Sequence, residues 1–351
     1  MADPILILAW LVLAHVMADF VFQTGSIAHA KSSHGTRALG GLVGHGLIVT
    51  ACLVPVGLAF GGPGWWFAVV VGVSHVVIDR TKVVLTRRAA ATALREAHER
   101  HEGPQPAEHL GRAWTPLPAA LFLADQIAHL AVIGVAWTAL LANASLQPGW
   151  VDAVNRAVGG RDPAAVHHIV SVAVVLLTLL IVNVRAASLF VGILVRPVEA
   201  GVDGEHRWGG RVTPLAPPAQ SGPATGAPNA RATARWSIRV GPIDARVTAE
   251  PEVANTPATP AASSAVPAPL GVSARVGSTI GVLERILIVV FVLTGTDVAI
   301  GFVVAAKTLA RFRLLDDRDF AEYYLLGTLA SVSAAIVTAL VGRAALGVLL
   351  A

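Results

Sequence analysis

Long apolar runs, interrupted by short polar segments, dominate the first half of the chain. A membrane-spanning helix needs roughly 20 consecutive apolar residues. Five runs of about that length lie at 4–22, 38–60, 65–85, 116–141 and 166–195. The first run has no basic start and no small-residue cleavage site, and it contains Asp19, so it predicts a retained membrane helix rather than a signal peptide.

The apolar pattern stops after Pro197. Residues 198–275 are rich in Pro, Ala and Gly and too poor in large apolar side chains to build a core, which predicts a disordered linker. Two β-like patches, 236–240 and 245–248, are too short to change this interpretation. We expect the linker to separate two membrane parts.

Apolar runs return at 280–293 and 324–350, with a shorter one at 299–310 that predicts a re-entrant or interfacial helix. The pattern therefore predicts an all-α bundle of about seven membrane helices plus this short helix. Three parts follow from it: a five-helix membrane domain at 1–197, the linker at 198–275, and C-terminal membrane helices at 276–351.

Composition agrees with the bilayer as the main solvent of this chain. Hydrophobic residues make up 54% of the 351 positions and charged residues only 14%, which is unlike a soluble protein of this length. The net charge is +4, and the basic residues form no stripe interleaved with aromatics, so no nucleic-acid partner is expected. A single cysteine, Cys52, excludes an intrachain disulfide and a cysteine-rich metal site.

Basic residues set the predicted orientation. They gather in the segments 24–37 and 80–114, which lie on one side of the membrane if the first four helices alternate in direction. The positive-inside bias of short loops places that side in the cytoplasm. We therefore expect a multi-pass protein of the bacterial inner membrane, with the linker in the cytoplasm and the N-terminus outside.

Several polar side chains interrupt the apolar runs, and such groups are costly at membrane depth, so each is a candidate for function. The first run has His15, Asp19 and Gln23 at a spacing of four, which predicts one helix face. The same logic applies to the second, third and fourth runs. Their polar residues are His45; His75, Asp79 and Lys82; and Asp125, Gln126 and His129.

Helices of opposite direction bring these residues to comparable depths in the cytoplasmic half of the membrane. Imidazoles and carboxylates together suit Zn²⁺, Mn²⁺ or a similar divalent transition metal, as one ion or a pair. The predicted metal ligands are His15, Asp19, His45, His75, Asp79, Asp125 and His129. The predicted catalytic residues are Asp19, His75, Asp79 and Lys82, and Gln23 and Gln126 are further polar members of the site.

A structural interpretation stands beside the metal site. A lone histidine on an apolar helix often serves as a hydrogen-bond partner between membrane helices, at roughly 1 kcal/mol each. Two His-x3-Asp pairs at matched depth are an expensive means of joining helices, which favours a functional site. Seven further histidines lie in loops or at a helix start and are expected to be solvated or interfacial: His29, His34, His98, His101, His109, His167 and His168. Glu284 and Arg285 are expected to be interfacial anchors.

These motifs resemble a known family. The stretch 13–23, His45, the element at 74–79 and the pair Asp125 and His129 resemble a bacterial integral-membrane family catalogued as domain of unknown function 3307. The segments 281–285, 299–307 and 322–329 resemble the C-terminal part of its longer members. The Ser-His-x3-Asp element is similar to one in membrane-bound metal-dependent hydrolases, although this chain lacks their additional histidine-rich loop.

The leading hypothesis is thus a metal-dependent hydrolase that acts on a lipid-like or phosphorylated amphiphile from the cytoplasmic side. No Gly-x-Ser-x-Gly nucleophile motif and no phosphate-binding glycine loop is present. A cation- or proton-coupled transporter is the alternative from another class, because the same Asp and His residues can relay a proton or bind a cation. A non-catalytic membrane scaffold is the third hypothesis.

Overall fold

The computed structural model describes residues 3–99, 112–199, 235–240, 243–248 and 270–350. The chain divides into two units, Met1–Arg211 with Arg275–Ala351, and Val212–Ala274. The first unit is helical, and the described part of the second is a β-hairpin followed by the start of a helix. Each unit is considered by itself.

The N-terminal part of the helical unit runs from α1 to α9. Its helices are α1 (Pro4–Met17), α2 (Gly25–Lys31), α3 (Gly35–Cys52), α4 (Val54–Phe60), α5 (Gly62–Glu99), α6 (Leu117–Ala136), α7 (Pro148–Val158), α8 (Pro163–Ile181) and α9 (Ala187–Val195). Three π-helical turns extend or join them: η1 (Ala18–Phe22), η2 (Trp137–Leu141) and η3 (Val182–Ala186). Two short strands pair antiparallel: β1 (Arg112–Ala113), which lies between α5 and α6 in the sequence, and β2 (Val198–Glu199), which follows α9.

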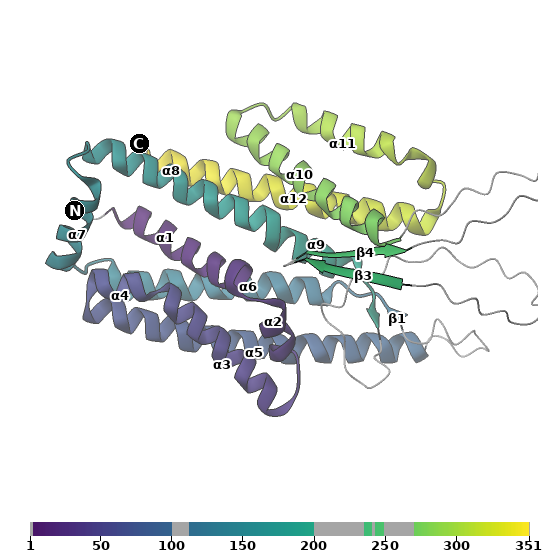
Figure 1. The fold of residues 1–351 in the computed structure, drawn as a ribbon, viewed down its shortest axis with the longest axis horizontal. Coiled ribbons are helices and arrows are strands. Elements are labelled where there is room, and N and C mark those ends of the chain that lie inside the picture. The colour runs from purple at the N-terminus through teal and green to yellow at the C-terminus, as the bar shows by residue number, and fades with distance from the viewer. Residues whose placement is uncertain (1–2, 100–111, 200–234, 241–242, 249–269, 351) are drawn as a thin grey trace, which may run out of the picture. The chain divides into compact units, whose positions relative to one another are not determined.

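Helix α1 is packed between two groups of helices. It contacts α8 on one side and α3 and α6 on the other, while α5 contacts α3, α4 and α6 (Figure 1). Asp3 caps α1 by accepting hydrogen bonds from the backbone of Ile5 and Leu6, and it also binds His167 on α8 at 2.9 Å. Burial raises the pKa of Asp3, but these hydrogen bonds outweigh it and hold the pKa below its ordinary value.

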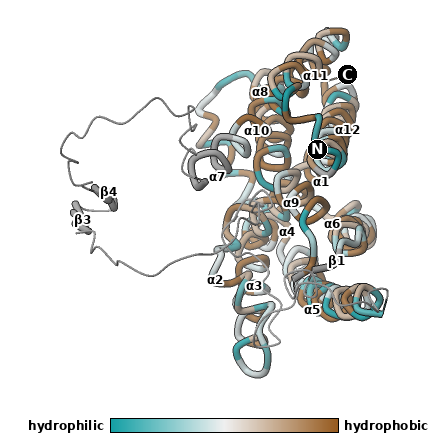
Figure 2. Tube along the Cα trace, turned by 90° about the vertical axis from the view of Figure 1, so that its right-hand side faces the viewer, coloured by the Kyte–Doolittle hydropathy of each residue, from teal (hydrophilic) through white to brown (hydrophobic). Residues whose placement is uncertain are grey.

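Apolar side chains are found both inside the helical unit and on its surface. One core cluster forms around Leu11, Val49 and Phe67, where α1, α3 and α5 meet. On the outside, large apolar residues such as Trp66 and Val135 are 66% and 69% exposed. Hydrophobic colour accordingly recurs on the helices, α6 and α10 among them, in Figure 2. Such extensive exposed apolar surface is typical of helices that face lipid.

The all-α class is confirmed for the helical unit, and the prediction of about seven membrane helices is supported in part. Among the described residues, five helices are long and apolar enough to cross a membrane: Pro4–Phe22, Leu117–Leu141, Pro163–Val195, Gly277–Thr294 and Phe320–Leu349. The pair α3 and α4 makes a sixth if it counts as one span bent by 41°. Pro55 is the second residue of α4, just after the bend, which explains the break. The chain therefore has the character of a multi-pass membrane protein.

Helix α5, which contains the predicted span 65–85, is not among these candidates. It has 38 residues, about 57 Å at 1.5 Å per residue, and so it is much longer than a bilayer core. The expectation that this helix ends near Leu85 is wrong, because α5 continues to Glu99. Ala, Leu, Arg and Glu dominate residues 89–99 and are strong helix formers, so the polar segment extends the helix.

The C-terminal helices belong to the same unit. They are α10 (Leu270–Thr294), α11 (Ala299–Ala310), the 3₁₀ turn η4 (Phe312–Leu314) and α12 (Arg318–Leu349). Helix α12 packs against α8 and α9, and a core of Val175, Ile288 and Ala335 joins α8, α10 and α12. The short apolar helix α11 coincides with the predicted run 299–310.

The second unit contains one feature that the linker prediction did not include. Strands β3 (Arg235–Val240) and β4 (Ile243–Thr248) pair antiparallel, with Arg235 opposite Thr248. The two β-like patches thus pair with each other, since alternating Ile and Val residues favour extended backbone. The rest of the predicted disordered linker lies outside the described residues, apart from β2 and the start of α10.

Candidate functional site

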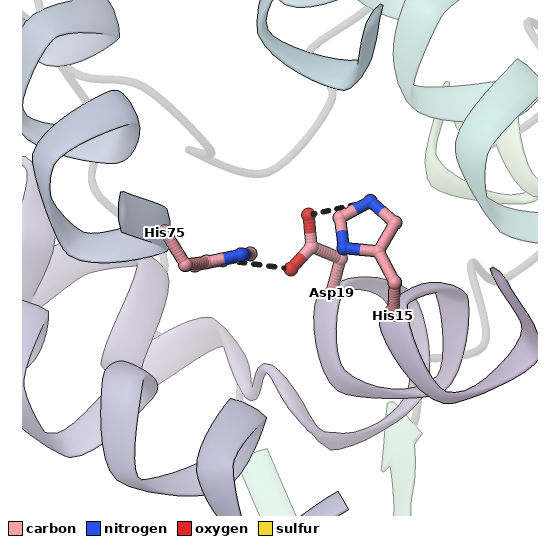
Figure 3. A group of neighbouring side chains, drawn as sticks. All are labelled: His15, Asp19 and His75. Carbon is pink, nitrogen blue, oxygen red and sulfur yellow. Dashed lines mark ion pairs between the residues drawn. The ribbon is translucent and has the colours of Figure 1, made fainter. Parts of the chain in front are cut away.

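Asp19 lies in the π-helical turn η1, one turn after His15. Such turns are rare and often occur at functional sites. In Figure 3 the Asp19 carboxylate lies between His15, on the same segment, and His75, which comes from α5. Gln23 does not share this helix face as predicted, because η1 ends at Phe22 and the backbone of Gln23 is extended.

Three side chains from three segments meet most closely. The Nε2 atoms of His45 on α3 and His75 on α5 are 2.9 Å apart, and each is 3.2 Å from Oδ1 of Asp19. The exposed fractions of His45 and His75 are 0% and 1%. We call His45, His75 and Asp19 the triad.

The size of this triangle matches the coordination sphere of a transition metal. The circle through its three atoms has a radius of about 1.8 Å, so an ion about 1 Å out of their plane lies about 2.0–2.1 Å from all three. That is the usual distance from Zn²⁺ to a histidine nitrogen or a carboxylate oxygen. The arrangement of donor atoms therefore fits one divalent ion.

A second group of ligand-type residues adjoins the triad. Asp79, Asp125 and His129 offer atoms that all lie within 4.8 Å of one another, and all three side chains are buried. Asp79 also groups with His45 and His75, since its Oδ2 is 3.7 and 3.8 Å from their Nε2 atoms. The His129 ring stacks on His75 with centroids 4.0 Å apart. We call Asp79, Asp125 and His129 the second group.

Gln126 connects these residues across helix α6. Its amide nitrogen donates to Asp19 at 3.2 Å and to Asp125 at 3.0 Å, and its amide oxygen is 3.3 Å from Nε2 of His15. The structure therefore brings together nine of the ten residues singled out in the sequence. The tenth, Gln23, is connected through a lysine.

That lysine, Lys31, was not predicted to belong to the site. Its ammonium donates to Asp79 at 2.5 Å and to Gln23 at 2.7 Å, and only 7% of the residue is exposed. The sequence interpretation counted it only among the basic residues of the segment 24–37, but it ends the short helix α2, which packs on α3. No sequence signal marks a short helix that turns back into the protein. Gln23, eight residues before Lys31, is a polar residue of the predicted site and binds this lysine.

A second lysine, Lys82, forms an ion pair with Asp125, as Lys31 does with Asp79. The Lys82 ammonium donates to Asp125 at 2.7 Å and lies over the Phe122 ring, 4.9 Å from its centroid. Its side chain is 27% exposed, whereas that of Asp125 is 2% exposed. Lys82 is thus the member of the site that most readily reaches the surroundings.

Some polar atoms of the site have no partner among the described residues. Neither ring nitrogen of His129 makes a hydrogen bond, and Oδ1 of Asp125 makes none. The Nδ1 atoms of His15, His45 and His75 are in the same condition. A buried polar group without a partner costs about 1–3 kcal/mol.

A shallow apolar groove follows the seam between α5 and α6. One part has a volume of about 510 Å³ and is lined by residues that include Val70, Ser74, Ile78 and Val132. A neighbouring part of about 470 Å³ shares Val70 and Val132 with it. On α5, Val70, Ser74 and Ile78 continue at helical spacing to Lys82, so the groove leads towards the Lys82–Asp125 pair.

Arg285 on α10 differs from its prediction as an interfacial anchor. It is 3% exposed and donates to the backbone oxygen of Asn183 at 2.7 Å, to Ser331 at 3.0 Å and to Ser188. Asn183 lies in the π-turn η3, whose altered hydrogen-bond pattern leaves carbonyl groups available. The Arg285 guanidinium is therefore satisfied by oxygen atoms of α9, α12 and η3 inside the protein rather than by the lipid interface. Its neighbour Glu284 pairs with Lys307 at 2.5 Å.

Of the seven histidines that were predicted to be solvated or interfacial, His29, His34, His98 and His168 are exposed. His167 is half-buried and binds Asp3. His101 and His109 lie outside the described residues.

Comparison with known proteins relates this site to a family. Residues 7–158 match the model of a family described as "Protein of unknown function (DUF3307)". This part of the chain is therefore similar to that family. The DUF3307 segment runs from within α1 to the end of α7 and so contains the triad, the second group and both lysines. No curated protein and no solved structure matches the chain.

Proposed function

We propose that the DUF3307 segment binds a divalent transition metal, Zn²⁺ or Mn²⁺, and acts as a metal-dependent hydrolase of the bacterial inner membrane. The observation that supports this most is the triad, whose three donor atoms are spaced as the ligands of one ion are. Because the donors are two imidazoles and one carboxylate, coordination positions stay open for water and substrate, as in catalytic zinc sites.

Each residue of the site has a role in this proposal. A bound divalent ion lowers the pKa of water and polarises an ester or phosphoryl oxygen. His45, His75 and Asp19 hold the ion, and Gln126 fixes the second oxygen of Asp19. Asp79 would accept a proton from this water, and the Lys82 ammonium would offset negative charge on the substrate.

The proposed substrate is a lipid-like or phosphorylated amphiphile. The groove between α5 and α6 offers apolar walls for an acyl chain, and its line of residues continues to the positively charged Lys82. An amphiphile with its anionic headgroup at Lys82 and its acyl tail in the groove matches both the charge and the apolar surface. The basic segments around α2 and the end of α5 favour a site that opens to the cytoplasm, with the linker on the same side.

A proton- or cation-coupled transporter is the second candidate. The observation in its favour is that ionisable groups form a connected buried series, from Lys31 through Asp79 and His75 to His45 and Asp19. Such series at membrane depth are typical of proton pathways.

Reconstitution into liposomes separates the two candidates. Full-length protein is supplied with Zn²⁺ or Mn²⁺ in vesicles that contain phosphatidic acid or a short-chain phosphate ester, and released phosphate and internal pH are both recorded. The hydrolase predicts phosphate release that a chelator stops and that His75→Ala abolishes, while His29→Ala, an exposed histidine, has no effect. Proton flux without hydrolysis would instead favour the transporter.

A further inference from the structure

We propose a second divalent cation site, formed by Asp79, Asp125 and His129, so that the cluster holds two ions with Asp79 shared between them. This inference rests on the metal site proposed above and adds a separate ion to it. The three residues offer ligand atoms within 4.8 Å of one another, and each is 3–4% exposed.

The unpartnered atoms of the second group point to a ligand. Both ring nitrogens of His129 and Oδ1 of Asp125 lack hydrogen-bond partners in the part of the chain that the structure describes. An imidazole with neither nitrogen satisfied is costly in an apolar interior. A cation bound by one nitrogen of His129 and by Oδ1 of Asp125 satisfies both side chains at once.

Asp79 is placed to bind both ions. It is the one residue that belongs both to the group with His45 and His75 and to the group with Asp125 and His129. Its Oδ2 lies 3.7 and 3.8 Å from the two triad nitrogens. In centres with two metals the ions are about 3.5–4 Å apart, a separation that a shared carboxylate can bridge.

The two sites differ in their donor atoms. The triad provides two imidazole nitrogens and one carboxylate, whereas the second group provides one imidazole and two carboxylates. Carboxylates suit harder ions such as Mn²⁺ and imidazoles suit Zn²⁺. Mn²⁺, which accepts both kinds of donor, is therefore the probe for both sites.

Lys82 competes with the second ion. Its ammonium lies 2.7 Å from Oδ2 of Asp125, beside the position that a cation takes on this carboxylate. Three aspartates, two lysines and neutral histidines give the cluster one net negative charge, so one divalent ion already makes it positive. The second ion is favoured only when Lys82 withdraws. Its 27% exposed side chain can do so, whereas the buried Lys31 stays with Asp79.

The test is Mn²⁺ titration of metal-stripped full-length protein in detergent, followed by electron paramagnetic resonance. The wild type is expected to bind two Mn²⁺ per chain, the second more weakly, with a spin-coupled signal at saturation. Asp125→Asn and His129→Ala are expected to keep one uncoupled Mn²⁺. Lys82→Gln is expected to tighten the second binding step about tenfold or more, and His29→Ala serves as the unchanged control.

The outcomes distinguish this inference from the proposed function. One Mn²⁺ per chain that depends on His45 and His75 but is unaffected by Asp125→Asn would overturn the second site and leave the first intact. No bound Mn²⁺ at all, together with no bound Zn²⁺ in a parallel titration, would overturn both. Weaker second-step binding in Lys82→Gln would also contradict the inference, and this variant does not depend on removing a ligand.

Discussion

Replacing Lys31 by methionine is expected to destabilise the protein far more than its loop position in the sequence suggests. The Lys31 and Asp79 side chains are 9% and 5% exposed, and their charged atoms are 2.5 Å apart. Removing one partner of a buried ion pair costs about 3–5 kcal/mol, because the other charge stays buried without compensation. The unfolding equilibrium constant should therefore rise by about two to four orders of magnitude.

The double variant Lys31→Met with Asp79→Asn tests the cause of this loss. It leaves no unpaired charge, so it should recover most of the stability of the single variant. Arg318→Met is the control, since the Arg318–Glu322 pair is 89% and 68% exposed and should contribute less than about 0.5 kcal/mol. Unfolding is followed by circular dichroism during titration of detergent-solubilised protein with SDS, with a chelator present so that no ion replaces the lysine.

A loss below about 1 kcal/mol for Lys31→Met would refute the buried position of this lysine. A double variant that is less stable than Lys31→Met would refute the charge argument, since it would show that packing rather than charge is responsible.

Three further outcomes are expected. Arg285→Leu should loosen the C-terminal helices and make α12 sensitive to limited proteolysis, whereas Arg318→Leu should not; equal resistance would contradict the buried hydrogen bonds of Arg285. Gly41→Ala should lower stability in SDS unfolding by about 1–3 kcal/mol, because the added Cβ would lie 2.6 Å from the Lys31 backbone nitrogen. Gly40→Ala is the control, since its Cβ meets nothing within 4 Å and should leave stability unchanged. Similar effects of the two variants would contradict the close packing of α2 on α3. Proteases added to inside-out vesicles should cut first within residues 202–273, and protection there, or cutting only from the outer face, would overturn the disorder or the orientation.

Much of the helical architecture follows from the length of apolar runs, because a bilayer sets that length directly. The runs that contain Asp19, Asp125 and Ile288 are all membrane-length helices in the structure. The prediction of helix ends is less accurate where a helix continues beyond its apolar run. Residues 86–99 are too polar for the bilayer but include many strong helix formers, so α5 continues past the expected end.

The site was predictable to the extent that buried polar groups need one another. His45, His75 and Asp79 were expected to converge because isolated ionisable groups in an apolar interior are costly, and the structure brings them within 4 Å. Lys31 and Arg285 were missed, because their partners depend on a short returning helix and on a π-turn. Neither feature has a hydrophobic period that reveals it in sequence.

The metal content of the purified protein tests the central claim most directly. Full-length chain purified in detergent without chelator should contain about one to two transition-metal ions by elemental analysis, and the paired variant His45→Ala with His75→Ala should lose the ion of the triad, while His29→Ala keeps it. Less than about a tenth of an ion per wild-type chain, also after incubation with Zn²⁺ or Mn²⁺ and removal of the excess, would contradict the metal site.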